Sequence, residues 1–377
     1  MESPDLVVDA DLGVIVGDAV RRGAVPGAVL LYGRGAEGPV RGGAFGAGVT
    51  LETVYDLASL TKVTVTLPCV LRLVEAGEVG LDDPVAKYLP GFAAGSSERV
   101  TIRHVLTHTS GLPAVREVWR LPGTAEDRFA AVLAEPLEAA PGTVVNYSDL
   151  GFIMIGRIIA DVVGRPLDEA FAELVAVPLG MTATGFRPSG PAAPTEANWF
   201  DDAGRQDPKS GVVHDENAES LGGVAGQAGL FGTAGDLAKY LRAGWLAADS
   251  PVLGSAMRAE ALKCQTSGLE GRRGLGWTLR GDSFDFMSDG WPLTGAGHTG
   301  FTGTSVAFDP VSGIWAVLLT NAVLFGRDNR ARGVRRSVHA AVATLFGVSI
   351  ADVGGEAVDS TLNGDDDGAG PGFRITA

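Results

Sequence analysis

Segments with strand-like patterns lie near both ends of this 377-residue chain, and this distribution constrains the fold more than any other feature. Near the N-terminus, the apolar run 28–32 and the segment 40–49 predict two strands joined by a turn. Late in the chain, segments 274–279, 303–309 and 314–321 predict three more. The early strands need pairing partners, and the late strands can supply them. We therefore expect both chain ends to build one sheet.

The stretch between these strands has mainly helical periodicity. Apolar residues recur at helical spacing at 102–108, 127–133, 150–163, 167–175 and 236–247, and a closing helix is predicted at 332–346. The pattern predicts an α/β domain interrupted by a helical one. The predicted division is a discontinuous α/β domain of residues 1–66 and 268–347, an inserted, mainly helical domain of residues 67–267, and a disordered tail of residues 348–377.

Charge and composition exclude several classes of partner. The formal net charge of −15 disfavours nucleic acid and anionic membranes. With no basic residue before Arg21 and no apolar run of about 18 residues, we expect neither a signal peptide nor a membrane span, and hence a cytoplasmic protein. Nothing in the sequence indicates an oligomeric state.

Three patterns imitate cofactor or metal sites. The glycines of 33–38 match a dinucleotide-binding pattern, but no helix follows them, so a hairpin turn is expected. His104 and His108 stand four residues apart, yet Val105 occupies the place where a zinc protease needs Glu. The acidic segment 363–374 lacks the flanking helices of a calcium site. We therefore predict no metal and no cofactor.

Ser59 and Lys62 form the most informative local motif, at the start of a predicted helix over 57–77. At helical spacing the two side chains share a face and can exchange a proton. The chain has 25 Arg and only five Lys, yet it uses Lys here, and Arg cannot act as a base. A Ser and a Lys at this spacing also occur by chance on exposed helix faces, so the pair alone is weak evidence.

Two further segments strengthen the motif. Tyr147 lies in a turn-rich loop just before the helix predicted from 150, and His298 lies in a segment of small residues, 295–304, that is expected to open a late strand. Together with Ser59 and Lys62, these segments have the composition of one active site.

The chain at this point resembles the class C β-lactamases and DD-peptidases, penicillin-recognising serine enzymes whose family also contains esterases and acyltransferases. The resemblance rests on Ser59 with Lys62, on Tyr147-Ser148-Asp149 and on His298-Thr299-Gly300, in the family order, and it covers roughly residues 10–347. Segments 102–112 and 222–230 also resemble the esterase-like members. It implies an α+β, β-lactamase/transpeptidase-like fold with a central antiparallel sheet flanked by helices.

The resemblance also implies a role for each residue. Ser59 would attack a carbonyl carbon, and Lys62 would act as its base if partial burial and nearby positive charge keep the amine neutral. Tyr147 would pass a proton to the leaving group. The backbone N–H groups of Ser59 and Phe301 would form the oxyanion hole. Substrate would be bound by Asp149, His298, Thr299 and Gly300.

Two positions depart from the family pattern. His298 replaces a common Lys, and with an ordinary pKa of about 6.5 we expect it to titrate between about pH 5 and 8. Asp149 replaces the usual Asn and adds a negative charge. Both changes argue against efficient penicillin hydrolysis. The predicted function is therefore a serine hydrolase for a small-molecule ester or amide, with an acyltransferase as the alternative, and with a DD-peptidase, a β-lactamase or a non-catalytic binding protein less favoured.

Overall fold

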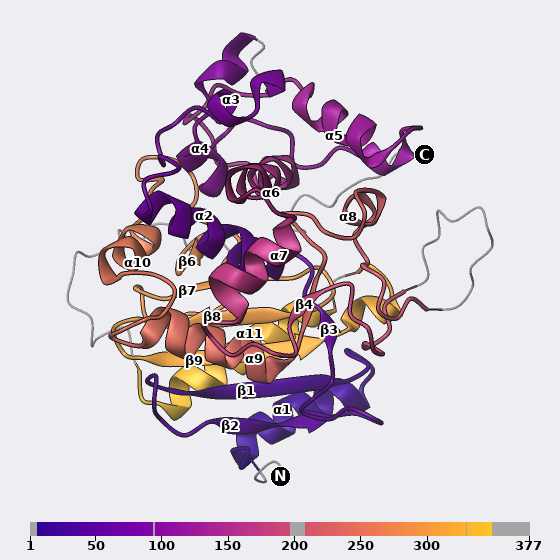
Figure 1. The fold of residues 1–377 in the computed structure, drawn as a ribbon. Coiled ribbons are helices and arrows are strands. Elements are labelled where there is room, and N and C mark those ends of the chain that lie inside the picture. Colours follow the sequence, from indigo (N-terminus) through magenta and orange to yellow (C-terminus); the bar gives the residue numbers. More distant parts are fainter. Residues whose placement is uncertain (1–5, 93–94, 197–207, 329, 349–377) are drawn as a thin grey trace.

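The structure is a computed structural model that describes residues 6–92, 95–196, 208–328 and 330–348. Within these ranges, a six-stranded antiparallel sheet has the order β2-β1-β9-β8-β7-β6 (Figure 1). Its strands are β1 (Ala28–Arg34), β2 (Arg41–Phe45), β6 (Thr278–Leu279), β7 (Ala296–Thr299), β8 (Ser305–Phe308) and β9 (Ile314–Thr320).

Strand β1 joins the two ends of the chain. It pairs with β2 on one side, and on the other with β9, from Ala28 opposite Thr320 to Arg34 opposite Ile314. The prediction of one sheet built from both chain ends is thus confirmed. The glycines of 33–38 make the hairpin turn between β1 and β2, as expected.

The two faces of β1 enter different cores, because successive side chains of a strand point to opposite faces. Leu30 and Tyr32 pack in one core with α1 (Ala10–Arg21) and α11 (Ala331–Leu345). Val29 and Leu31 belong to the larger core on the other face, which the helices of the middle segment cover. The predicted α+β fold, a central antiparallel sheet with flanking helices, is confirmed.

The middle segment supplies helices that stack above the sheet in Figure 1. Helix α6 is buried along most of its length in the larger core. Helix α9 packs directly against β1 and β9, although it comes from the stretch assigned to the inserted domain. The division into two domains stays a prediction, and the predicted tail lies, from residue 349 on, outside the described residues. The helices are α2 (Leu67–Glu75), α3 (Val85–Tyr88), α4 (Ile102–Leu106), α5 (Ala125–Leu133), α6 (Asp149–Val163), α7 (Leu167–Phe171), α8 (Glu216–Ser220), α9 (Ala234–Lys239) and α10 (Ser255–Leu262).

A second, three-stranded sheet orders β3 (Tyr55–Asp56), β5 (Leu230–Gly232) and β4 (Gly185–Phe186). Strands of two or three residues are too short to give a period-2 signal, so the sequence did not predict them. This sheet holds the chain just before Ser59. In the described part of the chain, none of the helices has the length and apolar character needed to cross a membrane.

Candidate active site

Ser59 follows a sharp turn between β3 and the helical segment that begins at Leu60. Ala58 has a φ of 48°, in the left-handed region that non-glycine residues rarely adopt. The buried Asp56 supports this turn, since its Oδ1 accepts from the Ala58 N–H at 2.8 Å and its Oδ2 accepts from the His214 N–H at 2.7 Å. The turn leaves Ser59 half-buried at the start of a helix.

Lys62 begins a π-helical turn, Lys62–Thr66, that precedes α2. Such turns are frequent at functional sites. The Lys62 side chain is fully buried, and its Nζ donates to Ser59 Oγ at 3.1 Å and to the Gln227 carbonyl at 3.1 Å. The predicted Ser59 and Lys62 pair is therefore in hydrogen-bond contact.

Asp149 forms an ion pair with Lys62, with 2.7 Å between Oδ1 and Nζ. Burial lowers the pKa of Lys62, but Asp149 and Tyr147 together more than offset this, and the pKa is raised overall. Lys62 is therefore protonated in the resting site. This corrects the expectation that nearby positive charge keeps the amine neutral: the closest charged group is negative.

Tyr147 lies beside this pair. Its hydroxyl is close enough to Ser59 and Lys62 for both to lower its pKa, and Lys62 Nζ lies 5.0 Å from the centre of its ring. Burial raises the pKa of Tyr147 even though the neighbouring Lys62 charge lowers it. The phenol is therefore protonated at rest and is a proton donor rather than a base.

The segment before α6 that carries Tyr147 is held by residues 108–114, which run beside it. The His108 carbonyl accepts from the Asn146 N–H at 2.8 Å, and His108 Nδ1 accepts from the Ser148 N–H at 3.1 Å. The Ser148 hydroxyl donates to the Pro113 carbonyl at 2.6 Å. The His108 ring lies 4.4 Å from the Tyr147 ring. The end of segment 102–112, together with Pro113, thus forms a platform for the loop that carries Tyr147.

His104 has a different function from His108. It closes a capping box with Thr101 at the start of α4. Each ring of this pair thus has structural contacts of its own. Among the described residues, no three His, Cys, Asp or Glu side chains converge in a way that could hold a metal ion.

The segment 222–230 contacts the other side of the helical segment that begins at Leu60 and carries Lys62. Besides the Gln227 carbonyl, the Gly226 carbonyl accepts from the Thr66 hydroxyl at 2.6 Å, and the Leu230 N–H donates to the Thr61 hydroxyl at 3.1 Å. Gly226 has to be small, since a Cβ there would lie 2.0 Å from the Phe152 carbonyl oxygen in α6. The segment thus locks the helix of Ser59 and Lys62 against α6.

His298 lies in β7 and is only 3% exposed. Its Nδ1 is 2.8 Å from the Thr299 carbonyl, which can only accept, so Nδ1 carries the hydrogen and Nε2 has the lone pair. Burial first, and then the charges of Lys62 and Arg273, lower the pKa of His298 to about 3. The expectation that it titrates between pH 5 and 8 is wrong, because burial keeps it neutral. Its ring lies 6.0 Å from that of Tyr147.

The turn between β7 and β8 lies against the turn that carries Ser59. The Thr302 hydroxyl donates to the Asp56 carbonyl at 2.8 Å, and the Thr304 hydroxyl donates to the Leu57 carbonyl at 3.2 Å. A Cβ at Gly300 would lie 2.5 Å from the Leu57 carbonyl oxygen, so only glycine fits. The segment 295–304 was expected to open a single late strand. It instead forms the short strand β7 and the turn that leads to β8.

Two backbone amides in these turns remain unused. Within the described ranges, neither the Ser59 N–H nor the Phe301 N–H donates a hydrogen bond. The Phe301 side chain points outwards and is 52% exposed, stacked at 5.7 Å on His214. Both amides are thus available to a ligand atom, as the predicted oxyanion hole requires.

Two carboxylates near the site were not predicted from the sequence. Asp56 has a weak sequence signal, because an Asp two residues before a strained position is typical of a side-chain-capped turn. Asp215 has none. Its Oδ1 accepts from the Ala218 N–H at 2.7 Å and from Gln227 Nε2 at 3.2 Å. Burial and the charge of Asp149 raise the pKa of Asp215 to about 6.

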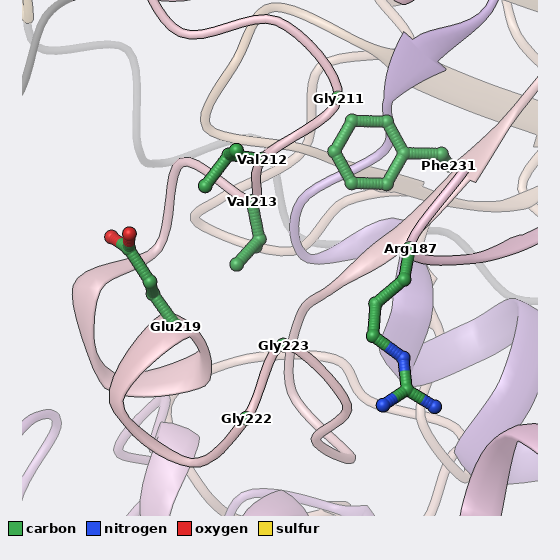
Figure 2. Close-up of a pocket in the computed structure, with 8 residues that line it drawn as sticks. All are labelled: Arg187, Gly211, Val212, Val213, Glu219, Gly222, Gly223 and Phe231. Atoms are coloured by element: carbon green, nitrogen blue, oxygen red, sulfur yellow. The ribbon is translucent and has the colours of Figure 1, made fainter. Parts of the chain in front are cut away.

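Figure 2 shows a pocket whose lining residues do not include Ser59, Lys62 or Tyr147. It has a volume of about 350 Å³ and includes Arg187 and Glu219 among its lining residues. Arg187 is paired with Asp168, and Glu219 with Lys209 at 2.5 Å. Both charged groups thus have partners, so the described residues that line this pocket offer no free charge to select a ligand.

The antiparallel sheet, the flanking helices and the contact between the half-buried Ser59 and the buried Lys62 agree with the family resemblance of the motifs. The family model described as Beta-lactamase matches residues 14–340, so the chain belongs to the β-lactamase family, and the resemblance seen in its motifs is confirmed.

Three similar proteins show the range of this family. A protein of Escherichia coli K12 named "Putative D-alanyl-D-alanine carboxypeptidase" is 34% identical over 311 residues, 72% of this chain and 70% of that protein. The solved structure of EstCE1, described as a hydrolase with promiscuous acyltransferase activity, is 25% identical, with a TM-score of 0.69 and coverage of 87% of this chain and 97% of EstCE1. The octameric penicillin-binding protein homologue of Pyrococcus abyssi shares the fold, with 23% identity, a TM-score of 0.70 and coverage of 90% and 77%.

Proposed function

We propose that this protein is an esterase-like serine hydrolase that forms an acyl-enzyme on Ser59. The observation that carries the proposal is the contact of Ser59 Oγ with a fully buried Lys62 that is also ion-paired to Asp149. A serine hydroxyl is a poor nucleophile without an adjacent base. In this arrangement Lys62 and Asp149 act together as that base.

In the acylation step, Ser59 Oγ forms a bond to the carbonyl carbon of the ester, and the electrons of the C=O π bond move to its oxygen. The Ser59 proton passes to Lys62 Nζ as a Lys62 proton passes to Asp149 Oδ1, over the 2.7 Å of the ion pair. The net result is one proton moved from Ser59 to Asp149. The amides of Ser59 and Phe301 donate to the new oxyanion.

The tetrahedral intermediate formed in this way then collapses, and the protons move in the reverse direction. The carbonyl re-forms, the bond to the alkoxy leaving group breaks, and Tyr147 donates its phenolic proton to the departing oxygen. Tyr147 regains a proton from Lys62, and Lys62 regains one from Asp149. The products are a free alcohol and a Ser59 ester, with the ion pair restored. Water then cleaves this ester by the same route.

Acyl transfer is the second candidate function. An alcohol or amine in place of water would take the acyl group through the same proton route, so the described residues serve both reactions equally. EstCE1, which is 25% identical to this chain, is described as a hydrolase with promiscuous acyltransferase activity, and this description supports acyl transfer as a candidate.

A carboxypeptidase activity, as in the name of the Escherichia coli relative, is less favoured. The free carboxylate of a peptide terminus needs a cation. Lys62 is paired with Asp149, and Arg273 is paired with Asp282 at 3.1 Å. His298 is neutral because of its burial. These contacts favour an ester or amide without a free carboxylate, and the cytoplasmic location stays a prediction.

Intact-mass spectrometry tests the proposal. Wild type, Ser59→Ala and the control Ser255→Ala, at an exposed position in α10, are treated with a fluorophosphonate, p-nitrophenyl esters and a penicillin. We expect adducts and ester turnover in wild type and the control, and neither in Ser59→Ala. No adduct and no turnover in wild type would leave a binding protein as the better description. If turnover rises with added alcohol and a new ester is formed, acyl transfer is the better description. If a peptide ending in D-Ala-D-Ala is cleaved faster than the p-nitrophenyl esters, the preference for esters is contradicted.

A further inference from the structure

We infer that Arg335, in α11, is a positioning residue that orients and polarises the peptide group of the oxyanion hole. This inference rests on the proposed function, because it concerns how the Phe301 N–H stabilises the intermediate. Neither the motifs nor the comparisons point to Arg335.

The geometry places the Arg335 guanidinium behind the turn between β7 and β8. Its Nη2 donates to the Gly300 carbonyl at 2.5 Å, and its Nε donates to the Gly303 carbonyl at 3.1 Å. The residue is only 5% exposed. One side chain thus binds both ends of the turn that carries Phe301.

The Gly300 carbonyl and the Phe301 N–H belong to the same peptide group. A trans peptide is planar, so its N–H points away from its C=O. With the carbonyl fixed on Arg335, the N–H is directed away from α11. The charged donor also draws electron density from the carbonyl, which makes the N–H at the other end of the group a stronger donor. Arg335 therefore sets both the direction and the strength of one oxyanion contact.

The charge of Arg335 has no other evident purpose in the described part of the chain. No carboxylate in that part pairs with it, and the neighbouring charge that shifts its pKa is another cation, Arg332. Burial lowers the pKa of Arg335 to about 9, so it remains charged at neutral pH. A buried charge without an ionic partner is costly, and an apolar residue in this position would be more stable. The charge has a purpose if it acts, through the Gly300–Phe301 peptide group, on the anion that forms at the Phe301 N–H.

The turn has independent attachments on its other side. The hydroxyls of Thr302 and Thr304 bind the carbonyls of Asp56 and Leu57, next to Ser59. Loss of Arg335 therefore leaves the turn anchored to the nucleophile segment. We expect a local change in the Phe301 peptide rather than loss of β7 and β8.

The experiment compares wild type with Arg335→Met and Arg335→Lys. The control is Arg336→Met, the next residue of the same helix, whose side chain is 59% exposed and lies 3.7 Å from Asp289. Two quantities are measured: kcat and KM for a p-nitrophenyl ester, and the ³¹P chemical shift of the phosphonate that a fluorophosphonate leaves on Ser59. The phosphonate oxygen stands for the oxyanion, so its shift reports the donor that faces it. Thermal melts establish that each variant is folded.

We expect Arg335→Met to lower kcat by about 10- to 100-fold with little change in KM, less than the loss of a whole oxyanion donor. Arg335→Lys should recover part of the rate, since it keeps the charge. The ³¹P shift should move in Arg335→Met and not in Arg336→Met. If wild type is labelled on Ser59 but the Arg335 variants have the same kcat and ³¹P shift as wild type, this inference alone is overturned. If wild type is not labelled on Ser59, the proposed function is overturned as well.

Discussion

Asp149 and Lys62 form an ion pair in which the lysine is fully buried and the aspartate is 22% exposed, with 2.7 Å between Oδ1 and Nζ. This contact fixes the protonation state in which the site waits for substrate. A carboxylate beside a buried amine holds the proton on the amine. Lys62 can then accept the Ser59 proton only if it releases one, and Asp149 is the group in contact to receive it.

The variant Asp149→Asn tests this proton route. An amide cannot take the proton, and without the carboxylate the pKa of the buried Lys62 falls, because Tyr147 alone offsets less of the effect of burial. Lys62 must then work as a free amine. We expect the variant to gain a rising limb in its kcat profile, tenfold per pH unit below the new Lys62 pKa, where wild type is flat between about pH 6 and 9. Identical profiles for the two enzymes would rule out Asp149 as the proton acceptor.

The roles of Lys62 and Tyr147 are tested by Lys62→Arg, Lys62→Ala and Tyr147→Phe. A positioned acid or base contributes about two to four decades in rate. We expect losses of that size in ester turnover for all three variants. Arginine keeps the positive charge but does not release its proton, so Lys62→Arg distinguishes proton transfer from simple electrostatic support. Wild-type rates in Lys62→Arg would show that only the charge matters.

The variant His298→Gln tests whether His298 is neutral. With its pKa lowered to about 3 by burial, His298 does not change charge between pH 5 and 8. We expect the variant to raise KM through lost packing and hydrogen bonding, while the shape of the kcat/KM profile over this range stays as in wild type. The measurement is a set of initial rates at half-unit pH steps. The disappearance of an inflection between pH 5 and 8 in the variant would mean that His298 does titrate there.

Asp215→Asn is expected to stabilise the protein at neutral pH. Burial and Asp149 raise the pKa of Asp215 from 3.8 in the unfolded chain to about 6 in the fold. Between these values the folded state keeps a proton that the unfolded state has lost, so stability falls as the pH rises through this window. Asparagine avoids this loss and can still accept from the Ala218 N–H. We expect a free energy of unfolding about 1 to 3 kcal/mol higher than in wild type at pH 7.5.

Denaturant titrations at pH 7.5, 6 and 4.5 check this stability prediction. The difference between Asp215→Asn and wild type should shrink as the pH falls, because both carry a neutral group at low pH. A difference that is constant with pH would assign the effect to something other than the ionisation of Asp215.

The sequence predicted the positions of the site better than its charges. Ser59, Lys62 and Tyr147 meet as their motifs indicate, because spacing on a helix and family order are properties of the sequence. The state of Lys62 and of His298 depends on burial and on which groups face them across the fold. Asp149 illustrates this. The sequence shows only that Asp stands where the family usually has Asn, and the fold shows that its carboxylate contacts Lys62.

The elements followed the same rule. Long periodic segments, such as α6 and α11, were located to within a residue or two, whereas β7 and the β3, β4 and β5 sheet were too short for a periodic signal. The sequence carries a weak signal for Arg335. It lies on the buried stripe of α11 with Val334, Val338 and Val342, and a charged residue on an apolar stripe indicates a buried partner.

The register of β1 with β9 has a consequence for how activity arises during synthesis. Ser59 is translated early, yet β7, β8 and β9, which bring the Phe301 turn to it, emerge more than two hundred residues later. Until those strands dock, the nucleophile lacks its second oxyanion donor, and a partly made chain should be unreactive. Labelling of Ser59 by a fluorophosphonate would therefore show that β7, β8 and β9 of a newly made molecule have joined the sheet.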